Sequence, residues 1–180
     1  MNYDAYIFDV DGVLIDTSQS FSSAVIYAVE KATASTPFQL YHYNSLKDIS
    51  GFNNDWNVAI TAAAWITFYQ SSSFESFLEL VIHKGNGFNS LKASTPEITD
   101  SLIQNVSRLA MEAYGGITAC EQLYGFKPTS IKIGGMWKNE TAYINNNDIK
   151  NISPISGIVT GRNNAEMKLA FQILGWNLPE

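Results

Sequence analysis

Apolar residues recur along this chain in two patterns: short runs near its two ends, and a helical periodicity between them. Residues 4–9, DAYIFD, form a short apolar run that predicts a buried strand, and Ile155 to Val159 form a second. Between about Leu46 and Tyr124, apolar positions return every three to four residues, which indicates amphipathic or buried helices. The predicted order is therefore strand, long helical block, strand and a final helix from Asn163 or Asn164.

Capping and breaking residues delimit the expected helices. The helices are expected over residues 20–33, 53–70, 73–85 and 97–116. Three residues ahead of the first helix can act as its N-cap, namely Asp16, Thr17 and Ser18. Pro37 breaks the pattern after that helix, and Gly115–Gly116 mark the end of the last one. Residues 130–153 are polar and rich in turn-forming types, which predicts a boundary.

Polar residues follow each predicted strand directly. The first strand is followed by Asp9, Asp11 and Gly12, and the second by Thr160, Gly161 and Arg162. Two such strands are expected to be parallel neighbours, and α/β folds place their ligand sites at the carboxyl ends of parallel strands. We therefore expect an α/β fold in which these six residues lie at one edge of the sheet.

Composition narrows the class of protein. The chain has 180 residues, of which 46% are hydrophobic and 16% charged, enough for one folded domain or a core with an insertion. A formal net charge of −6 argues against nucleic acid as a partner. Cys120 is a lone cysteine, so no disulfide can form within the chain. Without a signal peptide or an apolar run that spans a bilayer, we expect a cytoplasmic protein with no membrane partner.

The two carboxylates carry the candidate chemistry. Side chains alternate along an extended chain, so Asp9 and Asp11 are expected to point the same way. Like charges at that spacing repel unless a cation lies near them, and Mg²⁺ prefers such oxygen ligands. One carboxylate can then attack phosphorus, and the other can move a proton. Gly12 lets the backbone turn tightly toward an anion.

Other interpretations of the acidic pair fit less well. An EF-hand loop needs a glutamate at its twelfth position, where this chain has Ser20. A D-x-D motif that binds a nucleotide diphosphate through a metal normally lies deep in a domain, and not after the first strand. The carboxylates could also cap turns without any catalytic role.

At this point a resemblance becomes specific. The stretch FDVDGVLIDT, residues 8–17, resembles the first signature of the haloacid dehalogenase-like hydrolases, and SGIVTGR, residues 156–162, resembles the second. In that family the Ser or Thr at the end of the second signature and the amide after it hold phosphate, which corresponds to Thr160 and Gly161 here. The helical insertion is similar to that of the family's subgroup I, whose α-helical cap lies between these signatures.

The resemblance implies a fold and an activity. It implies a Rossmann-like core from residues 1–16 and 144–180, C-terminally incomplete, with a helical cap at 17–143. It also implies a Mg²⁺-dependent phosphatase that hydrolyses a small phosphorylated metabolite through an aspartyl-phosphate. Asp9 would be the nucleophile and Asp11 the acid and base, with Mg²⁺ on the Asp9 carboxylate and the Asp11 main-chain carbonyl.

Two elements of the family pattern have no counterpart. The family has a lysine and then a strand that ends in an acidic pair, both after the second signature. Only nineteen residues follow Gly161, and Lys168 falls within the expected final helix. We therefore expect either a truncated piece of a longer hydrolase, which we favour, or a non-catalytic phosphate-binding remnant. Both leave an apolar sheet face uncovered.

The insertion and the second signature contain further candidate residues. In GFNNDWN, residues 51–57, the candidates are Asn53, Asn54 and Asp55. They can cap the helix at Trp56, form a cap loop that selects the leaving group, or do both. Arg162 can pair with substrate or lie on the surface, and Asn163 can cap the final helix. The substrate's identity and the oligomeric state stay open.

Overall fold

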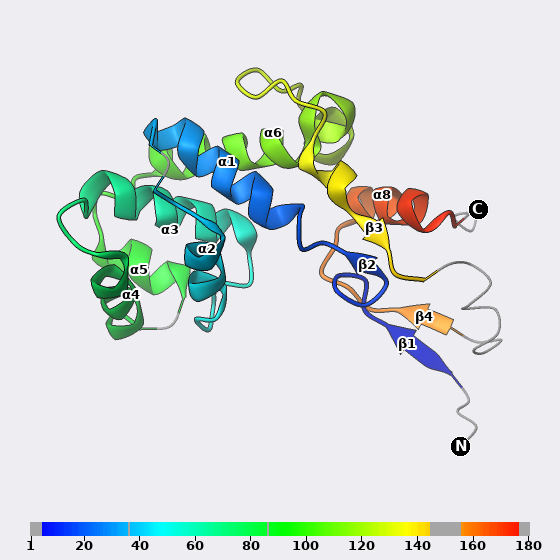
Figure 1. The fold of residues 1–180 in the computed structure, drawn as a ribbon, viewed down its shortest axis with the longest axis horizontal. Coiled ribbons are helices and arrows are strands. Elements are labelled where there is room, and N and C mark those ends of the chain that lie inside the picture. The colour runs from blue at the N-terminus through cyan, green and yellow to red at the C-terminus, as the bar shows by residue number, and fades with distance from the viewer. Residues whose placement is uncertain (1–4, 36, 86, 145–155, 177–180) are drawn as a thin grey trace.

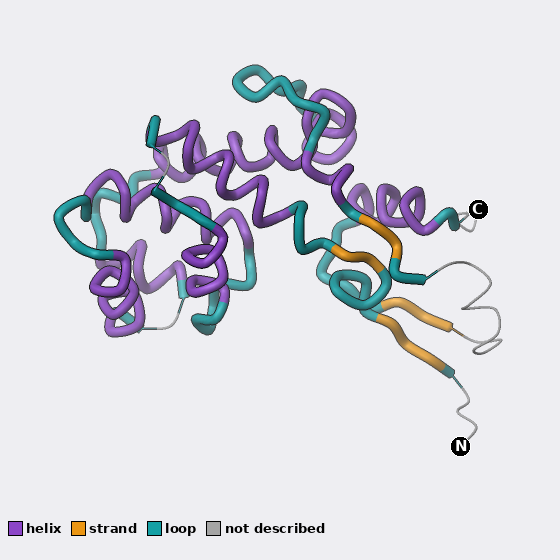
Figure 2. Tube along the Cα trace, viewed as in Figure 1, coloured by secondary structure: helices purple, strands orange, loops and turns teal. Residues whose placement is uncertain are grey.

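The computed structural model describes residues 5–35, 37–85, 87–144 and 156–176 and is mostly helical, with two small sheets (Figures 1 and 2). In chain order the elements are β1 (Tyr6–Phe8), β2 (Ile15–Asp16), α1 (Phe21–Thr33), α2 (Leu40–Lys47), α3 (Asp55–Phe68), α4 (Phe74–His83), α5 (Phe88–Ser94), α6 (Asp100–Tyr124), the 3-10 helix η1 (Met136–Asn139), β3 (Thr141–Ala142), β4 (Ser156–Ile158) and α8 (Asn164–Leu174). Helices α1 to α6 gather at one end of the molecule, and the strands with α8 lie at the other (Figure 1).

The predicted pairing of the two outer strands is confirmed. Strands β1 and β4 are parallel, with Phe8 opposite Ile158, and the amide of Val159 donates to the carbonyl of Phe8 at 2.9 Å. The carboxyl ends of both strands therefore lie side by side, and the segments that follow them start from one edge. Strands β2 and β3 form a separate antiparallel pair next to this edge.

The prediction that these strands are buried is wrong for one face of the pair. Ile7 is 71% exposed and Val159 is 66% exposed. Phe8 and Ile158, which alternate with them, pack against a small apolar cluster that includes residues of α8. Helix α8 therefore covers one face of the pair, and within the described ranges the other face stays open.

A second and larger core lies among the helices. Helix α1 packs against both α3 and α6, and α3 also packs against α6. Helix α3 is apolar on almost every side because it lies between its neighbours, and its residues 58–64 are all buried. Helix α8 contributes Leu169 to this core and Ala170 and Leu174 to the smaller one. The chain passes between the two ends of the molecule from β2 into α1 and returns through η1 into β3 (Figure 1).

The prediction that Gly115–Gly116 end α6 is wrong, because these residues bend the helix. The helix continues to Tyr124 through a kink at Gly116, whose φ and ψ are 56° and −165°. A Cβ on Gly116 would lie 2.2 Å from the amide nitrogen of Gly135, so only glycine allows this close approach. Ile117 donates to the carbonyl of Ile133 at 2.8 Å, which fixes the returning loop to the bend.

Two of the predicted helix starts are confirmed. Asn54 is the N-cap of α3 and accepts a hydrogen bond from the amide of Trp56 at 2.8 Å. Asn163 caps α8 and accepts from the amides of Ala165 and Glu166 at 2.8 and 3.0 Å. Both caps satisfy amides that would otherwise have no partner in the first turn.

The first helix lies where it was expected, but none of its three predicted N-caps is correct. Helix α1 begins at Phe21, and Ser20 occupies its N-cap position. Asp16 Oδ1 instead accepts from the amide of Ser18 at 2.9 Å, and so it closes a turn before the helix. Helices α2 and α5 were not predicted, because their short sequences do not show a clear apolar period. The boundary predicted over 130–153 falls partly in 145–155, outside the described residues.

Among the described residues, no helix combines the length and the hydropathy that crossing a membrane requires.

A buried carboxylate anchors the loop between α6 and η1. Glu112 is fully buried and accepts from the amides of Thr129, Ser130 and Ile131 at 3.0, 2.8 and 2.8 Å. Burial alone raises the pKa of Glu112, but these three amides and the Arg108 side chain outweigh it, so the pKa lies below its ordinary value. The ionised carboxylate is therefore the form that the fold requires.

We expect Glu112→Gln to lower the free energy of unfolding by about 2 kcal/mol at pH 7, because an amide replaces a charged acceptor. The folded-state pKa of Glu112 is depressed, so its contribution is present above the ordinary glutamate pKa and is lost as pH falls through the folded value. Urea unfolding at pH 7 and in acid measures both effects. A difference between wild type and variant that stays constant down to low pH would contradict this account.

Candidate active site

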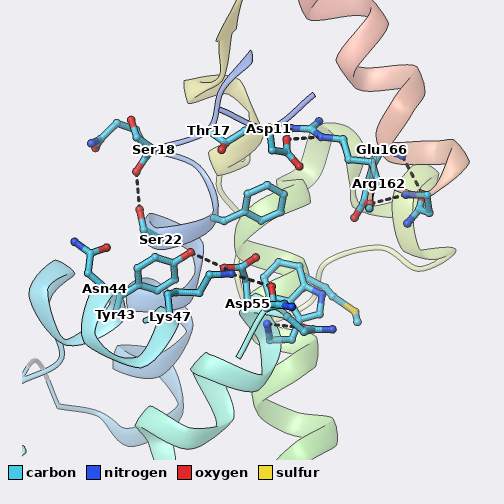
Figure 3. Close-up of a pocket in the computed structure, with 18 of the residues that line it drawn as sticks. Asp11, Thr17, Ser18, Ser22, Tyr43, Asn44, Lys47, Asp55, Arg162 and Glu166 are labelled. Atoms are coloured by element: carbon cyan, nitrogen blue, oxygen red, sulfur yellow. Dashed lines mark hydrogen bonds and ion pairs between the residues drawn. The ribbon is translucent and has the colours of Figure 1, made fainter. Parts of the chain in front are cut away.

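A cavity of about 770 Å³ lies between the helical end of the molecule and the loops that follow β1 and β4. Four parts of the chain line it: the segment from Asp11 to the start of α1, helix α2 with the start of α3, two residues of α6, and the segment from Gly161 to Glu166. Figure 3 shows Asp11, Arg162 and Glu166 toward one side and Tyr43, Lys47 and Asp55 toward the other. The cavity therefore joins the predicted strand-end residues to the predicted cap residues.

A buried ionic cluster forms the strand-end wall of the cavity. Arg162 Nε donates to Asp11 Oδ1 at 2.8 Å, and Arg162 Nη2 lies 2.6 Å from the same oxygen. Arg162 Nη2 also donates to Glu140 Oε2 at 2.8 Å, and the Tyr114 hydroxyl donates to Glu140 Oε1 at 2.8 Å. The cluster connects the loops after β1 and β4 to the end of η1 and to α6.

Burial makes these contacts electrostatically strong. The side chains of Arg162 and Glu140 are 2% and 0% exposed, and that of Asp11 is 38% exposed. Burial lowers the pKa of Arg162, but the hydrogen bond to Asp11 and the nearby negative charges outweigh it, so the pKa lies above its ordinary value. Burial is the largest cause that raises the pKa of Tyr114, and Glu140 adds to it. Arg162 is therefore a permanent cation and Tyr114 a neutral donor.

Phe21 supports the cluster from the first turn of α1. Its ring stacks on Tyr114 with centroids 4.6 Å apart, and the Arg162 guanidinium lies over it at 5.9 Å. The prediction that Arg162 could lie on the surface is wrong. Its pairing with Asp11 means that the two sequence signatures meet through a direct side-chain contact.

Sequence reasoning did not find Glu140 or Tyr114. Glu140 lies 22 residues before Arg162, and Tyr114 lies a further 26 residues before Glu140. Neither residue is part of a recognisable motif. Glu140 follows a 3-10 turn in the polar segment, and Tyr114 lies in an apolar part of α6. The sequence shows Glu140 only as an acidic residue among turn-forming residues, and this pattern is too common to indicate a functional site.

The predicted nucleophile lies outside the cavity wall. Asp9 is exposed, and its Oδ1 accepts from the amide of Val10 at 2.7 Å. Gly12 is also exposed, with a φ of 74°, and its amide donates to the carbonyl of Ile15 at 2.8 Å. Thr160 Oγ1 accepts from the amide of Arg162 at 3.2 Å. Of the predicted strand-end residues, the described structure brings three to the cavity, namely Asp11, Gly161 and Arg162.

The predicted cap loop does reach the cavity. Asn53, Asn54 and Asp55 all line it. Asp55 Oδ1 accepts from the Tyr43 hydroxyl at 2.5 Å and lies 3.1 Å from Lys47 Nζ. Lys47 Nζ also donates to the carbonyl of Asn53 at 2.8 Å. Burial, followed by the charge of Asp55, raises the pKa of Tyr43, so it stays a neutral donor.

Few side chains of the described structure could bind a divalent cation. Within the described residues, no group of three His, Cys, Asp or Glu side chains could hold a metal ion. Asp11 Oδ1 is engaged by Arg162, which leaves the exposed Asp9 carboxylate and the Asp11 carbonyl as the predicted ligands. Such a pair fits a magnesium ion that keeps most of its waters and takes further oxygens from a phosphate.

The overall fold is similar to that of a known protein. The structure aligns with the phosphatase Tt82 from Thermococcus thioreducens with a TM-score of 0.77 and 22% identity, over 96% of this chain and 69% of that one. A candidate phosphoglycolate phosphatase from Lactobacillus delbrueckii subsp. bulgaricus aligns with a TM-score of 0.48 and 17% identity, over 96% of this chain and 61% of that one. No protein-family model and no curated protein matches the sequence. The similarity to Tt82 is evidence for the fold alone.

We expect Arg162→Ala to lower the free energy of unfolding by about 3–5 kcal/mol, because it leaves the buried Glu140 carboxylate without its cation. Lys92→Ala is the matched control. It breaks an ion pair with Asp100 that is of similar length, 3.0 Å, but exposed, and it should cost less than about 1 kcal/mol. Urea unfolding monitored by circular dichroism measures both.

The double variant Arg162→Met/Glu140→Gln separates charge from packing. It removes both buried charges together, so it should be more stable than Arg162→Ala alone. Equal losses in Arg162→Ala and Lys92→Ala would show that the buried cluster does not stabilise the fold.

Proposed function

We propose that the chain is a phosphoric monoester hydrolase of the haloacid dehalogenase-like type, acting on a small phosphorylated metabolite. One observation carries the proposal: DVDG and TGR follow two adjacent parallel strands, and the Asp11 and Arg162 side chains bind each other across them. The likeness of the fold to a protein described as a phosphatase supports it.

The proposed reaction has two displacement steps at phosphorus. An Asp9 carboxylate oxygen bonds to phosphorus while the bond to the leaving oxygen breaks, and Asp11 gives that oxygen a proton. The Asp11 carboxylate then takes a proton from water, whose oxygen attacks phosphorus and releases Asp9. An aspartyl-phosphate on Asp9 therefore links the two steps.

Three residues after β4 are proposed to hold the phosphate. The Thr160 hydroxyl and the Gly161 amide would donate to its oxygens, as the resemblance implies. Arg162 Nη1 is buried and, within the described part of the chain, has no hydrogen-bond partner, so a substrate oxygen would satisfy it. For Asp11 to act as an acid, Arg162 must turn from it toward the phosphate, because the ion pair stabilises the ionised carboxylate.

Magnesium completes the proposed site. The Asp9 carboxylate and the Asp11 carbonyl would hold it beside the phosphate. When bound, Mg²⁺ supplies positive charge that offsets the charge of the transferring phosphoryl group.

We propose that the chain divides into a core and a cap, with the cavity between them. Residues 17–143 would form the helical cap and 1–16 with 144–180 the Rossmann-like core, as in the subgroup with a cap between the two signatures. The cap would carry the residues that contact the leaving group, and Asn53, Asn54 and Asp55 stand on that wall. We place the protein in the cytoplasm.

Asp9→Asn tests the nucleophile. It should reduce hydrolysis of p-nitrophenyl phosphate on the order of 10³-fold or more while circular dichroism stays unchanged, because an amide cannot form the acyl phosphate. Asp100→Asn removes a carboxylate from an exposed position outside the cavity wall and serves as the control. Full activity in Asp9→Asn would overturn this mechanism.

Metal removal tests the cofactor. Activity should fall to background after treatment with EDTA and return when Mg²⁺ is added in excess of the chelator, because the phosphoryl charge is then offset again. Hydrolysis that persists after EDTA treatment and exhaustive dialysis would show that Mg²⁺ has no part in the reaction.

A second candidate is a phosphate-binding chain without turnover, either alone or until a partner completes it. Two observations favour it. In the described structure Asp9 does not line the cavity, and Arg162 already binds the Asp11 carboxylate. Turnover by the purified 180-residue chain that disappears in Asp9→Asn would exclude this candidate.

A further inference from the structure

We infer that the cap side of the cavity takes a neutral, hydroxyl-rich leaving group, so that the substrate class is a polyol or sugar monophosphate and not a phosphorylated carboxylic acid. The inference rests on the proposed function for the position of the phosphate. It is carried by how the charges on the cavity wall are paired.

The first observation concerns the cations. Among the described residues, Lys47 and Arg162 are the cationic side chains on the cavity wall. Lys47 Nζ lies 3.1 Å from Asp55 Oδ1 and donates to the Asn53 carbonyl at 2.8 Å. Arg162 lies between two carboxylates in the strand-end wall, where the phosphate is proposed to bind. The cap wall therefore has no cation in excess of its own carboxylate.

The second observation concerns the acids. Asp11, Asp55 and Glu166 all contribute to the wall. A carboxylate on the leaving group would enter a cavity with more acidic than basic side chains. Like charges in a partly enclosed space repel more strongly than in bulk water. A second negative charge on the substrate is therefore disfavoured.

The remaining polar groups suit hydroxyls. Eight Ser, Thr, Asn and Gln residues line the cavity: Thr17, Ser18, Gln19, Ser22, Asn44, Asn53, Asn54 and Asn163. Hydroxyl and amide side chains both donate and accept, as the hydroxyls of a sugar do. Phe21 and Trp56 add aromatic surface on which the C–H groups of a sugar can rest. The volume of about 770 Å³ is within the range of small-molecule sites and leaves room for a hexose.

Asp55 is the residue whose change should alter this preference. It neutralises Lys47 and accepts from the Tyr43 hydroxyl. Asp55→Asn keeps an oxygen acceptor for Tyr43 but removes the charge that offsets Lys47. The cap wall then gains a free cation, which should favour a carboxylate on the substrate.

Two probes of nearly equal size test the inference. Glycerol 3-phosphate and 3-phosphoglycerate differ in whether the terminal carbon carries a hydroxyl or a carboxylate. Isothermal titration calorimetry on Asp9→Asn, in the presence of Mg²⁺, measures both dissociation constants without turnover. We expect glycerol 3-phosphate to bind at least tenfold tighter. Adding Asp55→Asn should reduce that ratio at least fivefold, whereas adding Asp100→Asn, in an exposed pair outside the cavity wall, should leave it unchanged.

The outcomes separate this inference from the proposed function. Equal or tighter binding of 3-phosphoglycerate, no binding of either probe, or a ratio that Asp55→Asn does not alter would each overturn the inference. Hydrolysis of p-nitrophenyl phosphate by the wild-type chain reports on the proposed function separately. A tenfold preference without any hydrolysis would support a polyol or sugar monophosphate as the ligand and would refute the phosphatase proposal.

Discussion

The buried pairing of Arg162 with Glu140 and Asp11 is the constraint on which the rest of the structure depends. A guanidinium that is 2% exposed is stable only with carboxylates around it, because an unpaired charge at that depth costs several kcal/mol. Its two partners lie on either side of the helical region: Asp11 precedes α1 and Glu140 follows η1. One side chain from the loop after β4 therefore joins both points at which the chain enters and leaves the helical region.

This arrangement also decides what the cavity offers. The cluster fixes the strand-end wall, and the Tyr43–Asp55–Lys47 contacts fix the cap wall opposite. Each wall pairs its cation with a carboxylate before any ligand arrives, so binding cannot rely on an excess of positive charge. Under the proposed function, a dianionic phosphate would compete with the two carboxylates for Arg162, whereas a neutral group beside Tyr43, Lys47 and Asp55 would only exchange hydrogen bonds with water.

Part of the candidate site could be predicted from the sequence because its signals are local. DVDG and TGR each combine an apolar strand with the polar residues that end it, and parallel pairing then brings them together. The caps at Asn54 and Asn163 are local in the same sense. Glu140, Tyr114 and Lys47 were not readable, since their roles depend on contacts between distant segments. The kink at Gly116 was missed because the close approach of Gly135 is not visible in the periodicity.

The two aspartates show where a local rule stops. Alternation predicts that Asp9 and Asp11 point the same way, but it holds only while the chain is extended, and β1 ends at Phe8. Beyond that point the Val10 carbonyl accepts from the amides of Val13, Leu14 and Ile15, so the chain curls at once. Arg162 then draws Asp11 to the cavity, while Asp9 hydrogen-bonds to the next amide. Under the proposed function, a phosphate bound to Arg162 would release the Asp11 carboxylate, which would then be free to approach the same centre as Asp9.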